Sequence, residues 1–199
     1  MKIAVFCSGN GSNFQAIADS VKAGDIKADI SVMVCDNPKA FAIERAKKLG
    51  IETFVTSLKD HKSRQDFEKA ILAELEVRKI ELVVLAGFMK VLSADFIAKY
   101  KNRIINIHPA LLPSFAGTDG IGDAIKYGVK ATGVTVHFVD AGVDTGPIIL
   151  QDAVEVRPDD THDSLAERIH KIEHQLYPRV VKLFVEGRIK IEGRVVKIT

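Results

Sequence analysis

Asn106 and His108 are two polar residues whose types and spacing would allow them to act together in catalysis. They follow an apolar run and precede Pro109. In extended backbone, residues two apart point to the same side, and Pro109 disfavours helical backbone at His108. An amide beside an imidazole suits acyl chemistry, because the amide can donate to a developing oxyanion and the imidazole can move a proton. A strand end with two hydrogen-bonded polar residues is the alternative interpretation.

A single acid, Asp144, lies in the glycine-containing segment 142–147. If the fold brings its carboxylate near His108, it can orient the ring and stabilise the imidazolium form. His137 stands in an alternating, strand-like run, and we expect it to have a hydrogen-bonded structural role. His170 and His174 are one helical turn apart, but no third ligand is evident, so we predict no metal site.

Length and composition limit the class of protein. The 199 residues suit one domain with a sizeable core, since domains usually run about 50–250 residues. Hydrophobic residues make up 47%, which argues against disorder. The 28 basic and 26 acidic residues give a net charge of +2, too even to indicate a nucleic-acid or membrane partner.

The cysteines and the N-terminus indicate the compartment. Cys7 and Cys35 each end an apolar run, so we expect buried thiols, and their separation fits no zinc spacing. The N-terminal apolar run is too short for a signal-peptide core. No apolar run approaches the roughly 20 residues of a membrane span. We therefore expect a cytoplasmic protein.

Short apolar runs alternate with amphipathic stretches in the first half of the chain. We predict strands at 3–7, 30–35, 53–55, 82–86 and 104–106, and helices at 12–21, 41–49, 63–77 and 93–100. Continuous apolar strands between helices indicate a parallel sheet covered on both faces. An alternating strand at 134–139 and a strand from 147 suit an antiparallel turn, and a helix at about 164–185 and a hairpin at 188–198 follow. The sequence thus predicts a single-domain α/β fold, with a Rossmann-like open, twisted, mostly parallel sheet, helices on both faces and an antiparallel C-terminal part.

The segment 8–13 joins the first strand to the first helix. Its glycines let the backbone approach an anion, the amides of a helix N-terminus point at it, and Ser12 and Asn13 add donors. The dinucleotide fingerprint requires a glycine where Phe14 stands, so a phosphate monoester is favoured over a dinucleotide. A plain tight turn is the alternative.

Two further loops are candidate ligand contacts. The segment 87–92 follows the carboxyl end of a strand, where open α/β sheets bind ligands, and its apolar residues can hold a flat aromatic ligand. A loop packed under the next helix is the alternative. The segment 117–122 contains three glycines, so we expect a mobile lid there, with Asp119 as a candidate helix N-cap.

Taken together, the segments 8–13, 85–89, 106–115 and 142–147 resemble the phosphoribosylglycinamide formyltransferases, in matching order over nearly the whole chain. The resemblance implies one formyltransferase domain, 1–199, with the phosphate and ribonucleotide loop in the N-terminal half and the folate and catalytic residues in the C-terminal half. It implies transfer of a formyl group from 10-formyltetrahydrofolate, a co-substrate, to the amine of glycinamide ribonucleotide in purine biosynthesis. We expect that the reaction requires no metal. The expected partners are these small molecules, without nucleic acid or membrane, for a monomer or homodimer.

The resemblance also assigns roles to individual residues. The implied catalytic residues are Asn106, His108 and Asp144. Gly11, Ser12 and Asn13 would hold the ribonucleotide phosphate, with Glu173 near its ribose. The folate site would be lined by Met89, Lys90, Val91, Leu92 and Asn106, with Arg64 facing the carboxylates of the folate tail.

The chain departs from the family pattern in one loop. Phe115-Ala116-Gly117 stands where the family usually has Phe-Pro-Gly, and the next residues lack the histidines of some members, so the conformation of 116–122 is not implied. A formyltetrahydrofolate hydrolase typically has a second His where Pro109 stands. A methionyl-tRNA formyltransferase would need an additional RNA-binding domain. A non-catalytic nucleotide-binding module is the alternative from another class, and the intact catalytic residues argue against it.

Overall fold

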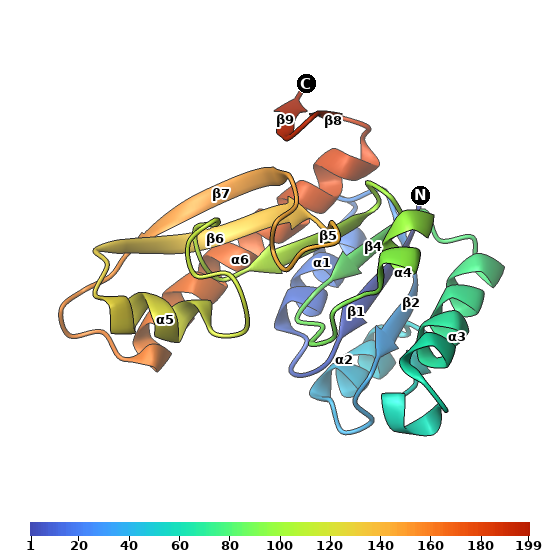
Figure 1. Cartoon of the computed structure of the whole chain (residues 1–199). Helices are drawn as coiled ribbons and strands as arrows, with labels where there is room; N and C mark the ends of the chain where they lie inside the picture. Colours follow the sequence, from blue (N-terminus) through green and yellow to red (C-terminus); the bar gives the residue numbers. More distant parts are fainter. The chain divides into compact units, whose positions relative to one another are not determined.

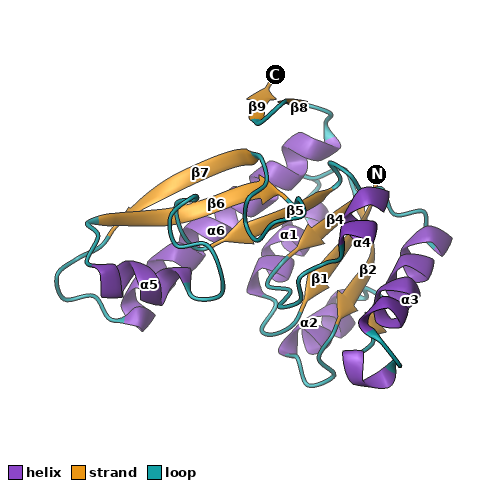
Figure 2. Ribbon diagram, in the orientation of Figure 1, coloured by secondary structure: helices purple, strands orange, loops and turns teal.

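The computed structural model describes all of residues 1–199, which form two compact units, Met1–Ile105 and Asn106–Thr199. The elements of the first unit are β1 (Lys2–Cys7), α1 (Ser12–Lys22), β2 (Asp29–Cys35), α2 (Phe41–Leu49), β3 (Thr53–Val55), the 3-10 helix η1 (Leu58–Asp60), α3 (Arg64–Val77), β4 (Leu82–Leu85) and α4 (Ala94–Lys99). β5 (Ile104–His108) runs from the first unit into the second. The second unit continues with α5 (Gly120–Tyr127), β6 (Ala131–Phe138), β7 (Ile148–Glu155), α6 (His162–Val185), β8 (Ile189–Glu192) and β9 (Val195–Ile198). Figure 2 distinguishes the helices, strands and loops.

The first unit is built on parallel strands, as predicted. β1 pairs with β2 and with β4, and β2 pairs with β3, all parallel, which gives the strand order β3-β2-β1-β4. β4 is buried along its whole length, because both faces of this sheet are covered. Figure 1 shows α1 and α2 on one face and α3 on the other. The edge-to-face contact of Phe6 with Phe88 ties the loop after β4 into this core.

Side-chain caps define where several helices begin. Ser63 accepts from the amide of Asp66 at the start of α3, and Ser93 accepts from the amide of Phe96 at the start of α4. Thr161 and Ser164 cap each other's backbone at the start of α6. Such caps typically contribute about 1 kcal/mol each. The short helix predicted at 93–100 is confirmed as α4, and η1 was not predicted, because a helix of this length leaves no periodic pattern.

The second unit contains the antiparallel part of the fold. β6 pairs with β7 in antiparallel register, and β8 pairs with β9 to form the predicted terminal hairpin. α6 packs against both β6 and β7, and α5 packs against α6. The strands are longer than predicted, since β6 begins at Ala131 and β7 continues to Glu155. None of the helices is long and apolar enough to cross a bilayer.

The predicted helix N-cap at Asp119 is confirmed, and the glycine-rich segment 117–122 is helical from Gly120 on. Asp119 caps α5 by accepting from the amide of Gly122, which places Gly120 and Gly122 in the first turn of a helix. Gly120 is buried, and a Cβ there would lie 3.1 Å from Nε2 of His108. This glycine therefore permits close packing against a candidate catalytic residue.

Candidate active site

Asn106 and His108 lie at the end of β5 and both contact Asp144, which the loop between β6 and β7 carries. Asn106 Nδ2 lies 3.4 Å from Oδ1 of Asp144, and His108 Nδ1 lies 3.4 Å from Oδ2. The imidazole is almost fully buried, with 3% of His108 exposed. The structure thus brings together the three residues that the sequence analysis singled out, from two distant segments of the chain.

Both ring nitrogens of His108 face acceptors. Nε2 lies 2.7 Å from the carbonyl oxygen of Phe115, while Nδ1 faces the carboxylate of Asp144. A neutral imidazole carries only one N–H, so one nitrogen would present a lone pair to an acceptor. The geometry therefore suits the doubly protonated imidazolium, which donates on both sides.

The environment of Asp144 keeps its carboxylate ionised. Burial alone would raise the pKa of Asp144, but hydrogen bonds from His137 and from the Gly117 amide, together with the charge of His108, outweigh it and hold the pKa below its ordinary value. The Gly117 amide donates to Oδ2 at 3.0 Å. Asp144 is thus a fixed negative charge beside the two imidazoles.

His137 belongs to the same cluster, although we expected only a structural role for it. Its Nδ1 lies 2.8 Å from the carbonyl of Phe138, so Nδ1 carries a proton. In the neutral ring, Nε2 accepts from Asn106 Nδ2 at 3.2 Å, and in the protonated ring it faces Oδ1 of Asp144 at 3.5 Å. We call Asn106, His108, His137 and Asp144 the polar cluster. The strand alternation gave no sign of this contact, because it does not reveal which strand is the neighbour.

The amide of Asn106 has a choice of acceptors. When His137 is neutral, one N–H of Asn106 points to His137 and the other to Asp144. Donation to a substrate oxyanion then requires that one of these bonds be given up. The 3.4 Å contact with Asp144 is at the long end of hydrogen-bond distances and is the weaker of the two.

A buried hydroxyl supports the turn that follows His108. Thr135 Oγ1 donates to the carbonyl of Ala110 at 2.6 Å and accepts from the amide of Leu112 at 3.0 Å. Gln151 Nε2 lies 2.9 Å from both that hydroxyl and the carbonyl of Leu112. These bonds fix the backbone of Ala110 and Leu112, just beyond the imidazole in the chain.

The two residues that contact the ring nitrogens of His108 share an unusual backbone conformation. Phe115 and Asp144 both have φ of 55°, in the left-handed region. This region is disfavoured for bulky residues such as Phe, and a residue held there costs about 1–3 kcal/mol. The ring of Phe115 packs edge-on to Tyr127 at 5.8 Å between centroids. The fold thus holds strained backbone at Phe115 and Asp144, the two residues that contact the ring nitrogens of His108.

The loop that carries Asp144 is stabilised by its own polar groups. Asp140 Oδ1 accepts from the amide of Gly142 at 3.1 Å and from the hydroxyl of Thr145 at 2.5 Å. Arg194 of the terminal hairpin donates to the carbonyl of Thr145 at 3.0 Å. At Gly146 a Cβ would lie only 1.8 Å from the carbonyl oxygen of Phe138, so only glycine fits.

In the first unit, the candidate phosphate turn 8–13 leads into α1, whose N-cap is Gly11. Gly11 has φ of 75° and α1 has no side-chain cap, as expected for a helix N-terminus that receives an anion. Gly11 also has a structural role, since a Cβ there would lie 2.7 Å from Cβ of Ala42. Arg45 of α2 braces the turn by donating to the carbonyl and the side-chain oxygen of Asn10, both at 2.9 Å.

The candidate folate loop, residues 87–92, contacts this turn and α3. The amide of Met89 donates to Ser8 Oγ at 2.8 Å, and Arg64 donates to the carbonyl of Val91. Met89 and Val91 expose 67% and 57% of their surface, whereas Leu92 is buried. The loop thus presents apolar side chains outward, beside the arginine that was expected to face carboxylates.

The remaining predicted residues are placed as follows. Glu173 lies in α6 of the second unit and is buried. Arg64 and the residues of the folate loop belong to the first unit, Met1–Ile105. Cys7 and Cys35 are buried free thiols, and burial raises the pKa of each. No group of His, Cys, Asp or Glu side chains is arranged to hold a metal ion.

The α/β architecture and the polar cluster define an enzyme suited to acyl transfer, because an amide, an imidazole and a fixed carboxylate converge. The sequence model of the Formyl transferase family matches residues 1–181. The chain therefore belongs to the formyl transferase family.

Individual relatives agree with this membership. The phosphoribosylglycinamide formyltransferase of Bacillus subtilis is 46% identical over 181 residues, which cover 91% of this chain and 93% of the relative. The human trifunctional purine biosynthetic protein adenosine-3 is 40% identical over 190 residues, 96% of this chain but only 19% of that protein.

Solved structures share the fold. Glycinamide ribonucleotide transformylase 1 from Symbiobacterium toebii has a TM-score of 0.97 at 43% identity, covering 100% of this chain and 93% of that chain. A formyltetrahydrofolate deformylase from Pseudomonas syringae has a TM-score of 0.92 at 22% identity, covering 99% of this chain and 65% of that chain. The second likeness concerns the fold alone.

Proposed function

We propose that this chain transfers the formyl group of 10-formyltetrahydrofolate to the amine of glycinamide ribonucleotide, giving formylglycinamide ribonucleotide and tetrahydrofolate in purine biosynthesis. The observation that carries the proposal is the convergence of Asn106, His108 and Asp144 in a member of the formyl transferase family. The relatives named for this activity, at 46% and 43% identity, support the choice of substrates.

The reaction forms one C–N bond and breaks another. The ribonucleotide amine attacks the formyl carbon, and the carbonyl oxygen becomes an oxyanion. Asn106 donates an N–H to that oxygen after giving up its weak contact with Asp144. The intermediate then expels the folate nitrogen. His108, as the imidazolium, gives a proton to this leaving nitrogen and regains one from the amine, and Asp144 stabilises the imidazolium.

We assign binding roles to the residues of the first unit. The backbone at Gly11, Ser12 and Asn13 would hold the ribonucleotide phosphate at the uncapped start of α1. The folate loop, with Met89, Lys90, Val91 and Leu92, would line the pterin pocket, while Arg64 would face the carboxylates of the folate tail. Glu173, from the second unit, is assigned to the ribose.

Hydrolysis of the same folate is the nearest alternative. The deformylase from Pseudomonas syringae shares the fold at 22% identity, but Pro109 stands where such enzymes typically have a second histidine. A non-catalytic nucleotide-binding module would not require the imidazole to be held between two acceptors. We further propose a cytoplasmic monomer or homodimer that acts on small molecules without nucleic acid, membrane or metal.

The test supplies both substrates to the purified protein in excess chelator and quantifies the formylated ribonucleotide, tetrahydrofolate and formate. We expect equal amounts of the first two products and no formate without ribonucleotide. The His108→Ala variant, purified identically, controls for a contaminating enzyme. Formate release that does not need ribonucleotide would establish the hydrolase instead. Activity lost with chelator and restored by added metal would exclude the metal-free reaction.

A further inference from the structure

The terminal hairpin, formed by β8 and β9, lies beyond the part of the chain that the family model matches, which ends at residue 181. β9 packs against β7, the strand that follows the loop carrying Asp144. At the tip of the hairpin, Arg194 Nη2 donates to the carbonyl oxygen of Thr145 at 3.0 Å. The hairpin therefore contacts the residue that follows Asp144 in the chain.

The local sequence fixes the position of Arg194. Glu192 pairs with Val195 across the hairpin, so Gly193 and Arg194 form a two-residue turn. Gly193 has φ of 62°, and glycine at the first position of such a turn matches the twist of the two strands. The backbone of Arg194 is therefore held by the hairpin, and only its side chain must be ordered to reach Thr145.

The loop between β6 and β7 needs support from other segments. Residues 141–143 are exposed, and Asp144 has φ of 55°, a backbone conformation that persists only where the surrounding structure enforces it. The Gly117 amide holds the side chain of Asp144 by donating to Oδ2. Arg194 holds the main chain of the loop at the next residue, Thr145. The two bonds thus restrain the carboxylate and the backbone that carries it.

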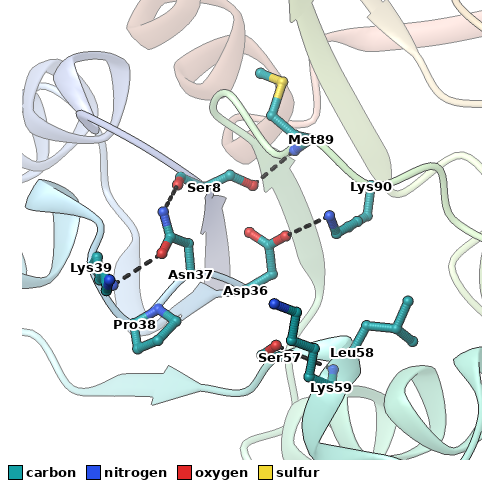
Figure 3. Close-up of a pocket in the computed structure, with 10 residues that line it drawn as sticks. All are labelled: Ser8, Asp36, Asn37, Pro38, Lys39, Ser57, Leu58, Lys59, Met89 and Lys90. Carbon is teal, nitrogen blue, oxygen red and sulfur yellow. Dashed lines mark hydrogen bonds and ion pairs between the residues drawn. The ribbon is translucent and has the colours of Figure 1, made fainter.

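Contacts of the same kind hold the folate loop of the first unit. Figure 3 shows Ser8, whose hydroxyl accepts from the amide of Met89, and Lys90, which pairs with Asp36 at 3.4 Å. Each contact joins the loop after β4 to the segment that follows a neighbouring strand. A loop whose residues are assigned to a ligand is thus held by side-chain contacts with its neighbours, and Arg194 has the same relation to the loop of Asp144.

We propose that Arg194 is a positioning residue for formyl transfer, which holds the backbone beside Asp144 so that the carboxylate stays against His108. The proposal rests on the proposed function. Oδ2 of Asp144 lies 3.4 Å from Nδ1 of His108, at the long end of hydrogen-bond distances, so a small shift of the loop would break this contact. Because Arg194 acts on the backbone, its effect on kcat should require the Asp144 carboxylate.

The first test measures kcat and both KM values in three variants. Arg194→Ala should lower kcat about 2- to 10-fold, the range for loss of one hydrogen bond, and leave the KM of ribonucleotide unchanged. Arg194→Lys keeps a donor and should restore most of kcat. Lys190→Ala, which removes another exposed cation of the hairpin, should change neither value. In the Asp144→Asn background, Arg194→Ala should cause little further loss.

Hydrogen exchange of the Gly117 amide gives a readout that needs no catalysis, because this amide donates to the Asp144 carboxylate. Its exchange should be about 2- to 10-fold faster in Arg194→Ala and unchanged in Lys190→Ala. Unchanged exchange or unchanged kcat in Arg194→Ala would overturn the proposal. Equal losses in Lys190→Ala, or a full additional loss in the Asp144→Asn background, would also overturn it. Absence of transfer in the wild type would instead refute the proposed function, and the exchange of Gly117 would still test the positioning.

Discussion

The polar cluster and the candidate phosphate turn are organised in opposite ways. In the cluster, the imidazoles of His108 and His137 are almost fully buried, and every ring nitrogen faces a protein atom. In the turn, Gly9 and Asn10 are exposed, and α1 begins without a side-chain cap. The groups that would do chemistry are thus fixed before substrate arrives, whereas the first amides of α1, which would hold an anion, have no side-chain cap.

This contrast has a physical reason. Stabilisation of a transition state depends on dipoles that are already oriented, and a buried site holds them without reorganisation. Phosphate binding requires only that amides stay accessible and correctly aimed. Substitutions in the cluster should therefore lower kcat or stability strongly, while substitutions around the turn should change ribonucleotide affinity modestly.

The largest effect is expected for His108 and Asp144. His108→Ala should lower kcat about 10²–10⁴-fold, the usual contribution of a general acid–base residue. Asp144→Asn should also lower kcat, because the imidazolium loses its carboxylate. If the two act as a unit, the double variant is little worse than His108→Ala alone. Steady-state kinetics on all three variants tests this, with circular dichroism as the control for folding. Multiplicative losses would show that the residues act independently.

Substitution of Asn106 should have the second-largest effect on kcat. Removing one oxyanion donor typically costs about 10²–10³ in kcat. Alanine is a better replacement than aspartate, because a carboxylate at position 106 would face that of Asp144 and confuse repulsion with lost catalysis. Asn106→Ala should lower kcat with little change in the KM of either substrate. Near-normal kcat in this variant would remove Asn106 from the mechanism.

Two buried threonines of β6, Thr135 and Thr132, allow a matched comparison of stability. Thr135→Val leaves the amide of Leu112 and the carbonyl of Ala110 without their partner, so the free energy of unfolding should fall by about 1–3 kcal/mol. Thr132 is the matched control, since it is equally buried on the same strand but its hydroxyl has no hydrogen-bond partner. Thr132→Val should be neutral or stabilising. Urea unfolding of both variants measures the difference, and equal losses would show that the bonds of Thr135 contribute nothing.

Around the turn, Arg45→Ala removes two hydrogen bonds to Asn10. The two bonds brace the turn and do not touch the ligand, so we expect only about the net value of one bond, roughly 0.5–1.5 kcal/mol, to appear as weaker binding. The KM for ribonucleotide should therefore rise about 2- to 10-fold, with kcat unchanged. Lys48→Ala, an exposed change on the same helix, is the control. Substitution of Gly11 cannot test the turn cleanly, because its Cβ would collide with Ala42 and disturb the packing of α2. A fall in kcat for Arg45→Ala would show that the turn affects catalysis as well as ribonucleotide affinity.

The sequence predicted the parallel strands and most helices, because continuous apolar runs and cap residues such as Ser93 are local signals. It also singled out Asn106, His108 and Asp144. The sequence did not predict the contact of His137 with the polar cluster. It also did not predict that a Cβ at Gly11 would lie too close to Ala42. Both depend on which segments become neighbours in the fold. The left-handed backbone of Phe115 could not be predicted from the sequence either, because tertiary contacts override the local preference of a bulky residue.

The smallest effect concerns acid stability. The pKa of Asp144 in the folded protein lies below its ordinary value, which is about 3.9 in an unfolded chain. Between these two values the unfolded chain binds more protons, so stability rises with pH through this window. The contribution of the Asp144 carboxylate is therefore complete above about pH 5 and is lost as the pH falls toward the folded pKa.

Asp144→Asn cannot ionise, so the difference in unfolding free energy between wild type and this variant should shrink as the pH falls below about 5 toward the folded pKa of Asp144. Arg45→Ala should show a nearly constant difference over the same range, because Arg45 bonds to the neutral side chain of Asn10. Urea unfolding at several pH values measures both. A constant difference for Asp144→Asn would mean that the surrounding imidazoles and the Gly117 amide do not favour the charged carboxylate. The stability of the polar cluster would then depend on pH no more than that of the turn, which is held by neutral groups.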